Sequence, residues 1–205
     1  SNNISKLPRK IKIICLSQND FESLRIRLKK FPLYLITPSI NELLDLKEYK
    51  KDNSYTEKNI FNLLFVGSLN MKMNIDAIIF FCKKFNNEIQ KKFGKNIRIN
   101  IVGRNPSKLI KEICREKEFN LYSNVSNSML LNLYKNSNLL IMPFPYNCGF
   151  KLKFLEAIEN GIPILGTECV NFSSKDKLPN SLFTNDKKKW LKHIELLTLF
   201  SNEEY

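Results

Sequence analysis

The sequence is poor in the residues that most often build catalytic and metal sites. It holds one histidine, His193, and five cysteines among its 205 residues. The cysteines are far apart and form no C-x-x-C pair, so neither a disulfide framework nor a zinc site is predicted, and reduced thiols in the cytoplasm are expected. His193 lies in a lysine-rich segment near the C-terminus, where a surface position is the simplest interpretation. We therefore predict no metal and no Ser-His or Cys-His catalytic pair.

Long apolar runs and targeting signals are also missing. No apolar run approaches the length of a membrane-spanning helix, and the first residues, SNNISKLPRKIK, lack the apolar stretch of a secretory signal. Hydrophobic residues nevertheless make up 43% of the chain and aromatic residues 11%. That content supports a sizeable core and excludes a disordered chain, so a cytoplasmic globular protein is expected.

Glycine is scarce, and the glycine-rich phosphate loops are absent. The chain has six glycines, no G-x-G-x-x-G behind a predicted strand and no G-x-x-x-x-G-K-[ST]. A nicotinamide dehydrogenase and a P-loop nucleotide hydrolase are both disfavoured, because their phosphate sites need those glycines at that spacing.

Acidic residues are outnumbered by basic ones. The chain has 33 Lys and Arg against 20 Asp and Glu, a formal net charge of +13. Such a surface attracts nucleic acid, anionic lipid or nucleotide phosphates. The abundance of Lys together with Asn and Ile also fits an AT-rich gene, which would raise lysine everywhere. No RNP-type aromatic motif and no helix-turn-helix pattern is present, so nucleic acid is disfavoured as a partner.

Short apolar runs alternate with longer amphipathic ones over most of the chain. Runs that are apolar on both faces predict strands of a parallel sheet covered on both sides, an α/β, Rossmann-like, doubly wound fold. Its ligands bind at the carboxyl ends of the strands. The predicted strands are 60–68, 96–104, 119–125, 138–144 and 162–168, with 181–185 as a candidate sixth, and the predicted helices are 74–93, 106–117, 126–137, 150–161 and 187–200.

The organisation of the chain changes near residue 60. Residues 47–59 are polar and charged and predict a linker or exposed loop. Behind them, 60–205 forms the predicted Rossmann-like domain. Residues 1–46, which precede the linker in sequence, are predicted to hold two strands, at 11–17 and 32–39, with a helix between them, and to form a separate segment. Capping of the helix at 126–137 is expected from Ser126 or Asn127, and Pro106 is expected near the first turn of the helix at 106–117.

The stretch NCGFKLKFLEAIENGIP at 147–163 has an unusual charge pattern. Lys151 and Lys153 fall in the first turn of a predicted helix, where cations oppose the helix dipole unless an anion is bound. Gly149 would let a ligand approach the backbone. Glu156, about one turn further, could accept hydrogen bonds from the vicinal hydroxyls of a ribose. The alternative is that both lysines are solvated and Glu156 pairs with one of them.

Four segments in register extend this pattern: LLFVGSLNMKMNIDAIIFF, INIVGRNPSKLI, NVSNSMLLNLYKNSNLLIMPF and GFKLKFLEAIENGIPILGTECV. Together they resemble the C-terminal, donor-binding domain of the group 1 glycosyltransferases, retaining enzymes of the GT-B fold. The resemblance covers about residues 60–172. The subgroup whose motif is G-x-K-x-K-x-L-E-A is the most similar, and its positions here are Gly149, Lys151, Lys153, Leu155, Glu156 and Ala157.

The resemblance implies a role for each site residue. Glu156 would bind the ribose. Lys151 and Lys153 are the predicted catalytic residues, and together with the backbone N–H groups near Phe150 they would face the diphosphate or the sugar. The two lysines would stabilise the leaving diphosphate without a metal. The remaining donor-binding residues would be Gly67 and Ser68 over the phosphates, Arg104 or Lys72 as added charge, Asn124 and Val125 beside the nucleobase, and Cys148. At Cys148 many members have a glutamate that contacts the donor sugar, so sugar contact is the least defined part.

The implied reaction moves a hexosyl unit from a nucleotide sugar to a glycan or lipid-linked acceptor, with retention, in surface polysaccharide or lipopolysaccharide synthesis. Residues 1–46 resemble the tail of the acceptor domain plus the connector. The chain is therefore expected to be the donor-binding half, with little or no transfer by itself. A cytoplasmic position is expected, with peripheral contact at the inner face of the plasma membrane as an extension, since 187–200 is a basic amphipathic segment.

Three alternatives remain at this stage. The first is a sugar-nucleotide epimerase of the same overall shape, which has a different pattern around its glycines. The second is a non-catalytic glycosyltransferase remnant, a basic module that binds membrane or polyanions. The third is nucleic-acid binding, which predicts steep salt dependence without base preference. Nucleotide binding separates the donor-binding interpretation from the last two.

Overall fold

The structure is a computed structural model that describes residues 13–15, 18–27, 32–35, 60–147, 152–170 and 181–200. The chain divides into two compact units, Ser1–Glu42 and Leu43–Tyr205. In the first unit, two short parallel strands flank one helix: β1 (Ile13–Cys15), α1 (Gln18–Arg27) and β2 (Leu33–Leu35). Its assignment to the tail of an acceptor domain stays a prediction, as do the predicted domain limits.

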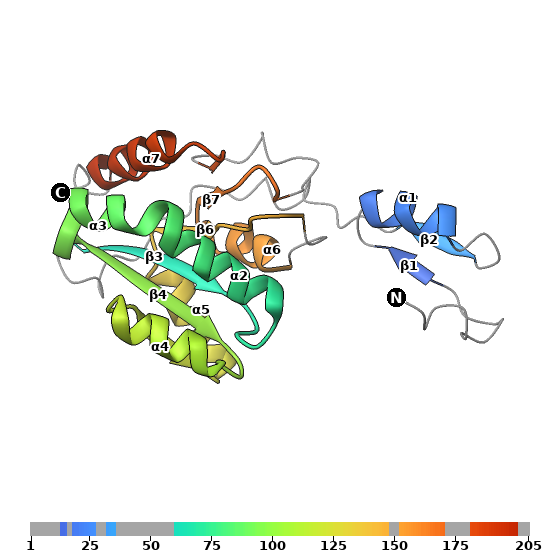
Figure 1. The fold of residues 1–205 in the computed structure, drawn as a ribbon, viewed down its shortest axis with the longest axis horizontal. Coiled ribbons are helices and arrows are strands. Elements are labelled where there is room, and N and C mark those ends of the chain that lie inside the picture. The colour runs from blue at the N-terminus through green and yellow to red at the C-terminus, as the bar shows by residue number, and fades with distance from the viewer. Residues whose placement is uncertain are drawn as a thin grey trace. The chain divides into compact units, whose positions relative to one another are not determined.

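The second unit is built on a six-stranded sheet in which every described pairing is parallel (Figure 1). The order β5-β4-β3-β6-β7-β8 corresponds to 3-2-1-4-5-6 when the strands are counted within this unit, which is the Rossmann order. The predicted fold class is confirmed. The strands are β3 (Phe61–Val66), β4 (Ile97–Gly103), β5 (Asn120–Ser123), β6 (Leu139–Met142), β7 (Ile164–Gly166) and β8 (Leu182–Phe183).

Helices cover both faces of this sheet. In Figure 1, α2 and α3 cross in front of the strands and α5 lies behind them. Ion pairs join α7 to α3, and hydrogen bonding joins α5 to α6. The helical elements are α2 (Lys72–Phe81), a π-helical turn η3 (Cys82–Asn86), α3 (Asn87–Phe93), a 3-10 turn η4 (Gly94–Asn96), α4 (Lys108–Glu116), α5 (Asn127–Lys135), α6 (Leu152–Glu159) and α7 (Lys187–Phe200).

The helix predicted at 74–93 is not one regular α-helix. It begins at Lys72, and the wider turn η3 divides it into α2 and α3. Phe81, Phe85 and Ile89 are all buried and are four residues apart. A regular helix rotates 400° over four residues, so such a row drifts off one face. The wider turn compensates for this drift and keeps the three side chains in the core.

The helix predicted at 106–117 begins two residues later than expected. The Ser107 hydroxyl accepts a hydrogen bond from the Ile110 N–H, so Pro106 precedes the cap and is not in the first turn. At the next helix, the Ser126 hydroxyl accepts from the Met129 N–H at 3.2 Å. Of the two residues considered there, Ser126 is therefore the cap, as side-chain oxygens at this position commonly are.

The core beneath α7 is aromatic. The Trp190 side chain is fully buried and stacks on the Phe85 ring at a centroid distance of 3.9 Å. Its indole N–H donates to the carbonyl of Thr184 at 2.8 Å, so the buried polar atom is satisfied. Among the residues that the structure describes, Trp190 and Ile194 are the buried positions of α7. The predicted helix at 187–200 is therefore confirmed, and its apolar side packs into the core.

Candidate functional site

A cavity of about 600 Å³ lies at the carboxyl ends of β3, β4 and β5. Its size is in the usual range for small-molecule sites, and its place at strand ends is where doubly wound sheets bind ligands. Three strand ends and two helices, α5 and α6, form its walls. The lining residues are Val66, Gly67, Ser68, Val102, Gly103, Arg104, Val125, Asn127, Leu130, Leu131, Tyr134, Lys153, Glu156, Glu159 and Asn160.

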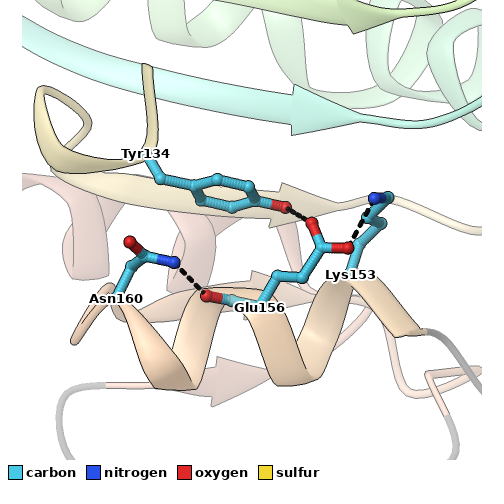
Figure 2. Close-up of polar contacts among 4 residues, drawn as sticks. All are labelled: Tyr134, Lys153, Glu156 and Asn160. Atoms are coloured by element: carbon cyan, nitrogen blue, oxygen red, sulfur yellow. Dashed lines mark hydrogen bonds and ion pairs between the residues drawn. The ribbon is translucent and has the colours of Figure 1, made fainter. Parts of the chain in front are cut away.

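The carboxylate of Glu156 is the most connected polar group of the cavity (Figure 2). Its Oε2 accepts a hydrogen bond from the Tyr134 hydroxyl at 2.9 Å, and its Oε1 pairs with the Lys153 ammonium at 2.6 Å. One turn later, the Asn160 amide donates to the Glu156 carbonyl at 2.7 Å. Glu156 is thus held by both its side chain and its backbone, from α5 and from α6.

The Lys153–Glu156 pair is a contact between residues three apart on α6. The two side chains are 37% and 33% exposed. A partly solvated pair of this kind stabilises a helix by only about 0.5 kcal/mol. The pairing agrees with the alternative that Glu156 pairs with a neighbouring lysine, but it lies in a cavity and not on open surface. Because the pair is weak, an incoming anion could separate it at small cost.

Tyr134 differs from Lys153 in its surroundings. Tyr134 is only 1% exposed, yet it is one of the residues that line the cavity. Burial, and then the neighbouring negative charge of Glu156, raise the pKa of Tyr134 well above the usual value for tyrosine. The phenol therefore stays protonated at neutral pH and acts as a hydrogen-bond donor to Glu156.

This raised pKa predicts how stability depends on pH. Above about pH 10 an unfolded tyrosine loses its proton while folded Tyr134 keeps it, so the contribution to stability is complete below pH 10 and falls above it. Between pH 10 and pH 11 we expect the free energy of unfolding of the wild type to fall by about 1 kcal/mol more than that of Tyr134→Phe. Urea unfolding of both proteins at the two pH values measures the difference. Equal slopes would contradict the raised pKa.

The loop behind β5 forms the apolar end of the cavity. Asn124 adopts a left-handed conformation with φ of 54°, and its side-chain oxygen accepts from the Asn105 N–H at 3.1 Å. Its own N–H donates to the Gly103 carbonyl at 3.0 Å. These bonds fix the loop so that Val125, Leu130 and Leu131 line the cavity. Asn124 itself shapes this wall and is not one of the lining residues that the structure describes.

The ends of β3 and β4 form the opposite wall and approach each other closely. The Gly67 N–H donates to the Val102 carbonyl at 3.0 Å, and the Asn74 amide donates to the Ser68 carbonyl at 2.9 Å. Arg104 lines the cavity, so its guanidinium adds positive charge. Lys72, the other candidate for this role, pairs instead with Asp76 on its own helix at 2.7 Å.

The structure brings together predicted residues that lie far apart in sequence: Gly67, Ser68, Arg104, Val125, Lys153 and Glu156. Cys148, Gly149, Phe150 and Lys151 fall outside the described residues, so their roles stay predictions. Sequence reasoning missed Tyr134 and Asn160. Tyr134 occupies an inward position of a predicted helix, and the one available signal was that a buried tyrosine hydroxyl needs a hydrogen-bond partner.

Residues 60–198 match the family model described as glycosyl transferases group 1, which covers more than half of the chain. The chain belongs to this family, as the sequence motifs suggested. The retaining mechanism and the G-x-K-x-K-x-L-E-A subgroup remain expectations.

Individual relatives agree with this assignment. The chain is 26% identical over 143 residues to an uncharacterised 44.6 kDa protein in the cps region of Klebsiella pneumoniae, a match that covers 65% of this chain and 36% of that protein. Its fold is similar to that of a glycosyltransferase from Rickettsia africae (TM-score 0.61, 14% identity, 98% of this chain, 58% of that chain). The fold is also similar to that of S. aureus TarM, crystallised with fondaparinux, alpha-GlcNAc-glycerol and UDP (TM-score 0.60, 13% identity, 96% of this chain, 38% of that chain).

A trehalose-phosphate synthase from Burkholderia xenovorans, described as UDP-forming, also shares the fold (TM-score 0.59, 11% identity, 90% of this chain, 52% of that chain). The chain spans about a third of its Klebsiella relative and between 38% and 58% of these three solved structures. Within the described ranges, no helix is long and apolar enough to cross a membrane. The same residues hold no group of three or more His, Cys, Asp or Glu that could bind a metal ion.

Proposed function

We propose that this chain is the donor-binding half of a glycosyltransferase and that its cavity binds a nucleotide sugar. The observation that supports this most is the position of the Glu156 carboxylate inside a cavity at the strand ends, beside the basic groups of Lys153 and Arg104. A carboxylate accepts the hydroxyls of a ribose, and the two cations complement a diphosphate.

In this proposal the ribose lies on Glu156 and the base lies against Val125 and Leu131. Lys153 leaves Glu156 and moves to the diphosphate, a stronger anion, together with Arg104 and the predicted partner Lys151. As the glycosidic bond to the diphosphate breaks, these cations stabilise the charge that develops on the leaving group. No metal is needed for that stabilisation.

The rest of the reaction depends on parts of the enzyme beyond this half. We propose that a hexosyl unit passes, with retention, to a glycan or lipid-linked acceptor bound by an N-terminal domain, and that this chain alone transfers little. The relative in the cps region favours surface polysaccharide synthesis. A cytoplasmic protein that contacts the membrane peripherally agrees with a lipid-linked acceptor.

Thermal unfolding with nucleotides tests the proposal. UDP, GDP, ADP and CMP are each added to the 205-residue chain, with and without an attached sugar. A ligand at one hundred times its dissociation constant stabilises a folded protein by about 2.7 kcal/mol, which is a readable shift in Tm. We expect one nucleotide series to raise Tm. If none does at millimolar concentrations, the donor-binding proposal is wrong.

Replacing Lys153 distinguishes binding of the diphosphate from binding of the nucleoside. We expect Lys153→Met to lower affinity for the preferred nucleoside diphosphate about tenfold, because one charge-assisted hydrogen bond is lost. Affinity for the matching nucleoside should stay level or rise, since Glu156 loses a competing partner. Titration calorimetry measures both. Lys111→Met removes an exposed charge on α4 outside the cavity and serves as the control; an equal loss in the two variants would contradict a specific contact.

A second candidate function rests on the basic face formed by α3 and α7. Lys91, Lys188 and Lys192 are exposed there. A remnant that binds polyanions would use this face, and its affinity for heparin or anionic vesicles would fall steeply with salt. Binding that persists in Glu156→Gln and shows no nucleotide preference would favour this alternative over donor binding.

A further inference from the structure

We propose that Tyr134 is a positioning residue that gives the site its selectivity for a ribose over a deoxyribose. The inference rests on the proposed function, because it requires Glu156 to bind the sugar hydroxyls of a nucleotide. Its basis is the hydrogen bond from the buried Tyr134 hydroxyl to Glu156 Oε2, together with the different exposure of the two groups that hold this carboxylate (Figure 2).

The two partners of Glu156 play different parts when a nucleotide binds. Lys153 is partly exposed, sits on a flexible stem and is attracted by the diphosphate, so it can exchange partners. Tyr134 cannot follow, because its ring is buried in the wall of the cavity. Once Lys153 has left, Tyr134 is the side chain, among the residues that the structure describes, that still bonds the Glu156 carboxylate and fixes its rotamer.

The geometry leaves room for both ribose hydroxyls. An ionised carboxylate has about four acceptor positions, and Tyr134 occupies one of them on Oε2. The departure of Lys153 frees Oε1, so each oxygen retains space for one hydroxyl donor. Without the phenol, the carboxylate could rotate about its side-chain torsions and would meet the two hydroxyls in the correct orientation for only part of the time.

The second anchor lies on the backbone of the same residue. The Asn160 amide holds the Glu156 carbonyl at 2.7 Å, which ties the last turn of α6 but leaves the side chain free to rotate. The orientation of the carboxylate therefore depends on Tyr134 and not on the helix alone. Because Tyr134 remains protonated, this restraint does not vary between pH 6 and pH 9, a range well below the ordinary pKa of tyrosine.

Affinities for paired nucleotides test the inference. UDP, GDP and ADP are titrated into the chain beside their 2′-deoxy forms. For the preferred base, we expect the wild type to bind the ribonucleotide about tenfold more tightly than the deoxynucleotide, the effect of one hydrogen bond to a charged acceptor. Tyr134→Phe keeps the ring and removes the hydroxyl, and we expect this ratio to fall to about two or three.

The ratio distinguishes positioning from a general structural role. A variant that is only less stable loses affinity for both nucleotides equally and keeps the ratio of the wild type. Tyr146→Phe is the matched control, because it removes another tyrosine hydroxyl that bonds a carboxylate, Asp76, outside the cavity lining. Far-UV circular dichroism of each variant establishes that it is folded. In a Glu156→Gln background, Tyr134→Phe should not change the ratio further.

Each outcome decides between the two proposals. If the wild type binds no nucleotide, the proposed function fails and this inference fails with it. If the wild type prefers the ribonucleotide and Tyr134→Phe keeps the tenfold ratio, the inference alone is overturned. If the ratio falls in Tyr134→Phe, and Tyr146→Phe matches the wild type, Tyr134 is the positioning residue.

Discussion

Replacing Glu156 with glutamine is expected to weaken binding of the preferred nucleoside diphosphate by about a hundredfold. Glutamine has the same shape, but only one of its two terminal atoms accepts hydrogen bonds, and the other is a donor. A donor facing the Tyr134 hydroxyl or a ribose hydroxyl cannot reproduce the bonds that the carboxylate makes. Two charge-assisted bonds of about 1.5 kcal/mol each give an effect of this size.

Calorimetry on folded protein measures this loss. Glu112→Gln, on α4, removes a negative charge from a helix outside the cavity and should bind like the wild type. The free energy of unfolding without ligand should change by only about 1 kcal/mol in Glu156→Gln, because the lost pair with Lys153 is weak and partly solvated. If Glu156→Gln binds the nucleotide within a factor of three of the wild type, Glu156 does not bind the ribose.

Alanine at Gly103 is expected to destabilise the second unit by about 3 kcal/mol. A β-carbon there would lie 1.7 Å from the backbone oxygen of Gly67 and 2.9 Å from the Leu69 side chain. The obstacle is a backbone atom of the residue that directly follows β3, so no side-chain rotation relieves it. The ends of β3 and β4 would have to separate, and since both glycines line the cavity, nucleotide binding should be lost as well.

The expected loss of stability in Gly103→Ala comes from a steric clash, and a second glycine, Gly94, serves as the comparison. Gly94 has a φ of 53°, but a β-carbon there would meet no atom within 4 Å. Its ψ of −128° lies outside the left-handed helical region, in a conformation that is almost restricted to glycine, so Gly94→Ala should cost about 1–3 kcal/mol of backbone strain and leave the cavity intact. Urea unfolding of both variants compares the two effects. A Gly103→Ala protein as stable as the wild type, or one that still binds the nucleotide as Gly94→Ala does, would show that the strand ends can move apart freely.

The sequence alone was sufficient to predict the sheet. Continuous apolar runs, such as the fully buried LLIM of β6, leave no polar face of the strand for solvent, so they predict a sheet covered on both sides. Ser126 was predictable as a cap for a similarly local reason, since its side chain bonds within its own helix turn. Residues at strand ends, such as Gly67 and Arg104, were placed at one edge because parallel strands share their carboxyl ends.

Contacts between distant elements were not predictable in this way. Tyr134 and Glu156 are separated by 22 positions and meet because folding brings α5 and α6 together. No periodicity within either helix indicates that meeting. The π-helical turn η3 was missed for a related reason, because it reflects packing of Phe85 against Trp190, more than one hundred residues later in the chain. A doubly wound sheet implies a reversal of strand order, but its place, between β3 and β6, appears only in the folded sheet.

A crystal structure of the chain with the preferred nucleoside diphosphate tests the central claim most directly. The account predicts that the ribose 2′ and 3′ hydroxyls lie within hydrogen-bond distance of the Glu156 carboxylate. Lys153 should have moved from Glu156 to the diphosphate, and Tyr134 should still donate to Glu156 Oε2. A nucleotide bound elsewhere, or a Lys153–Glu156 pair that remains closed beside a ribose that does not touch it, would contradict the account.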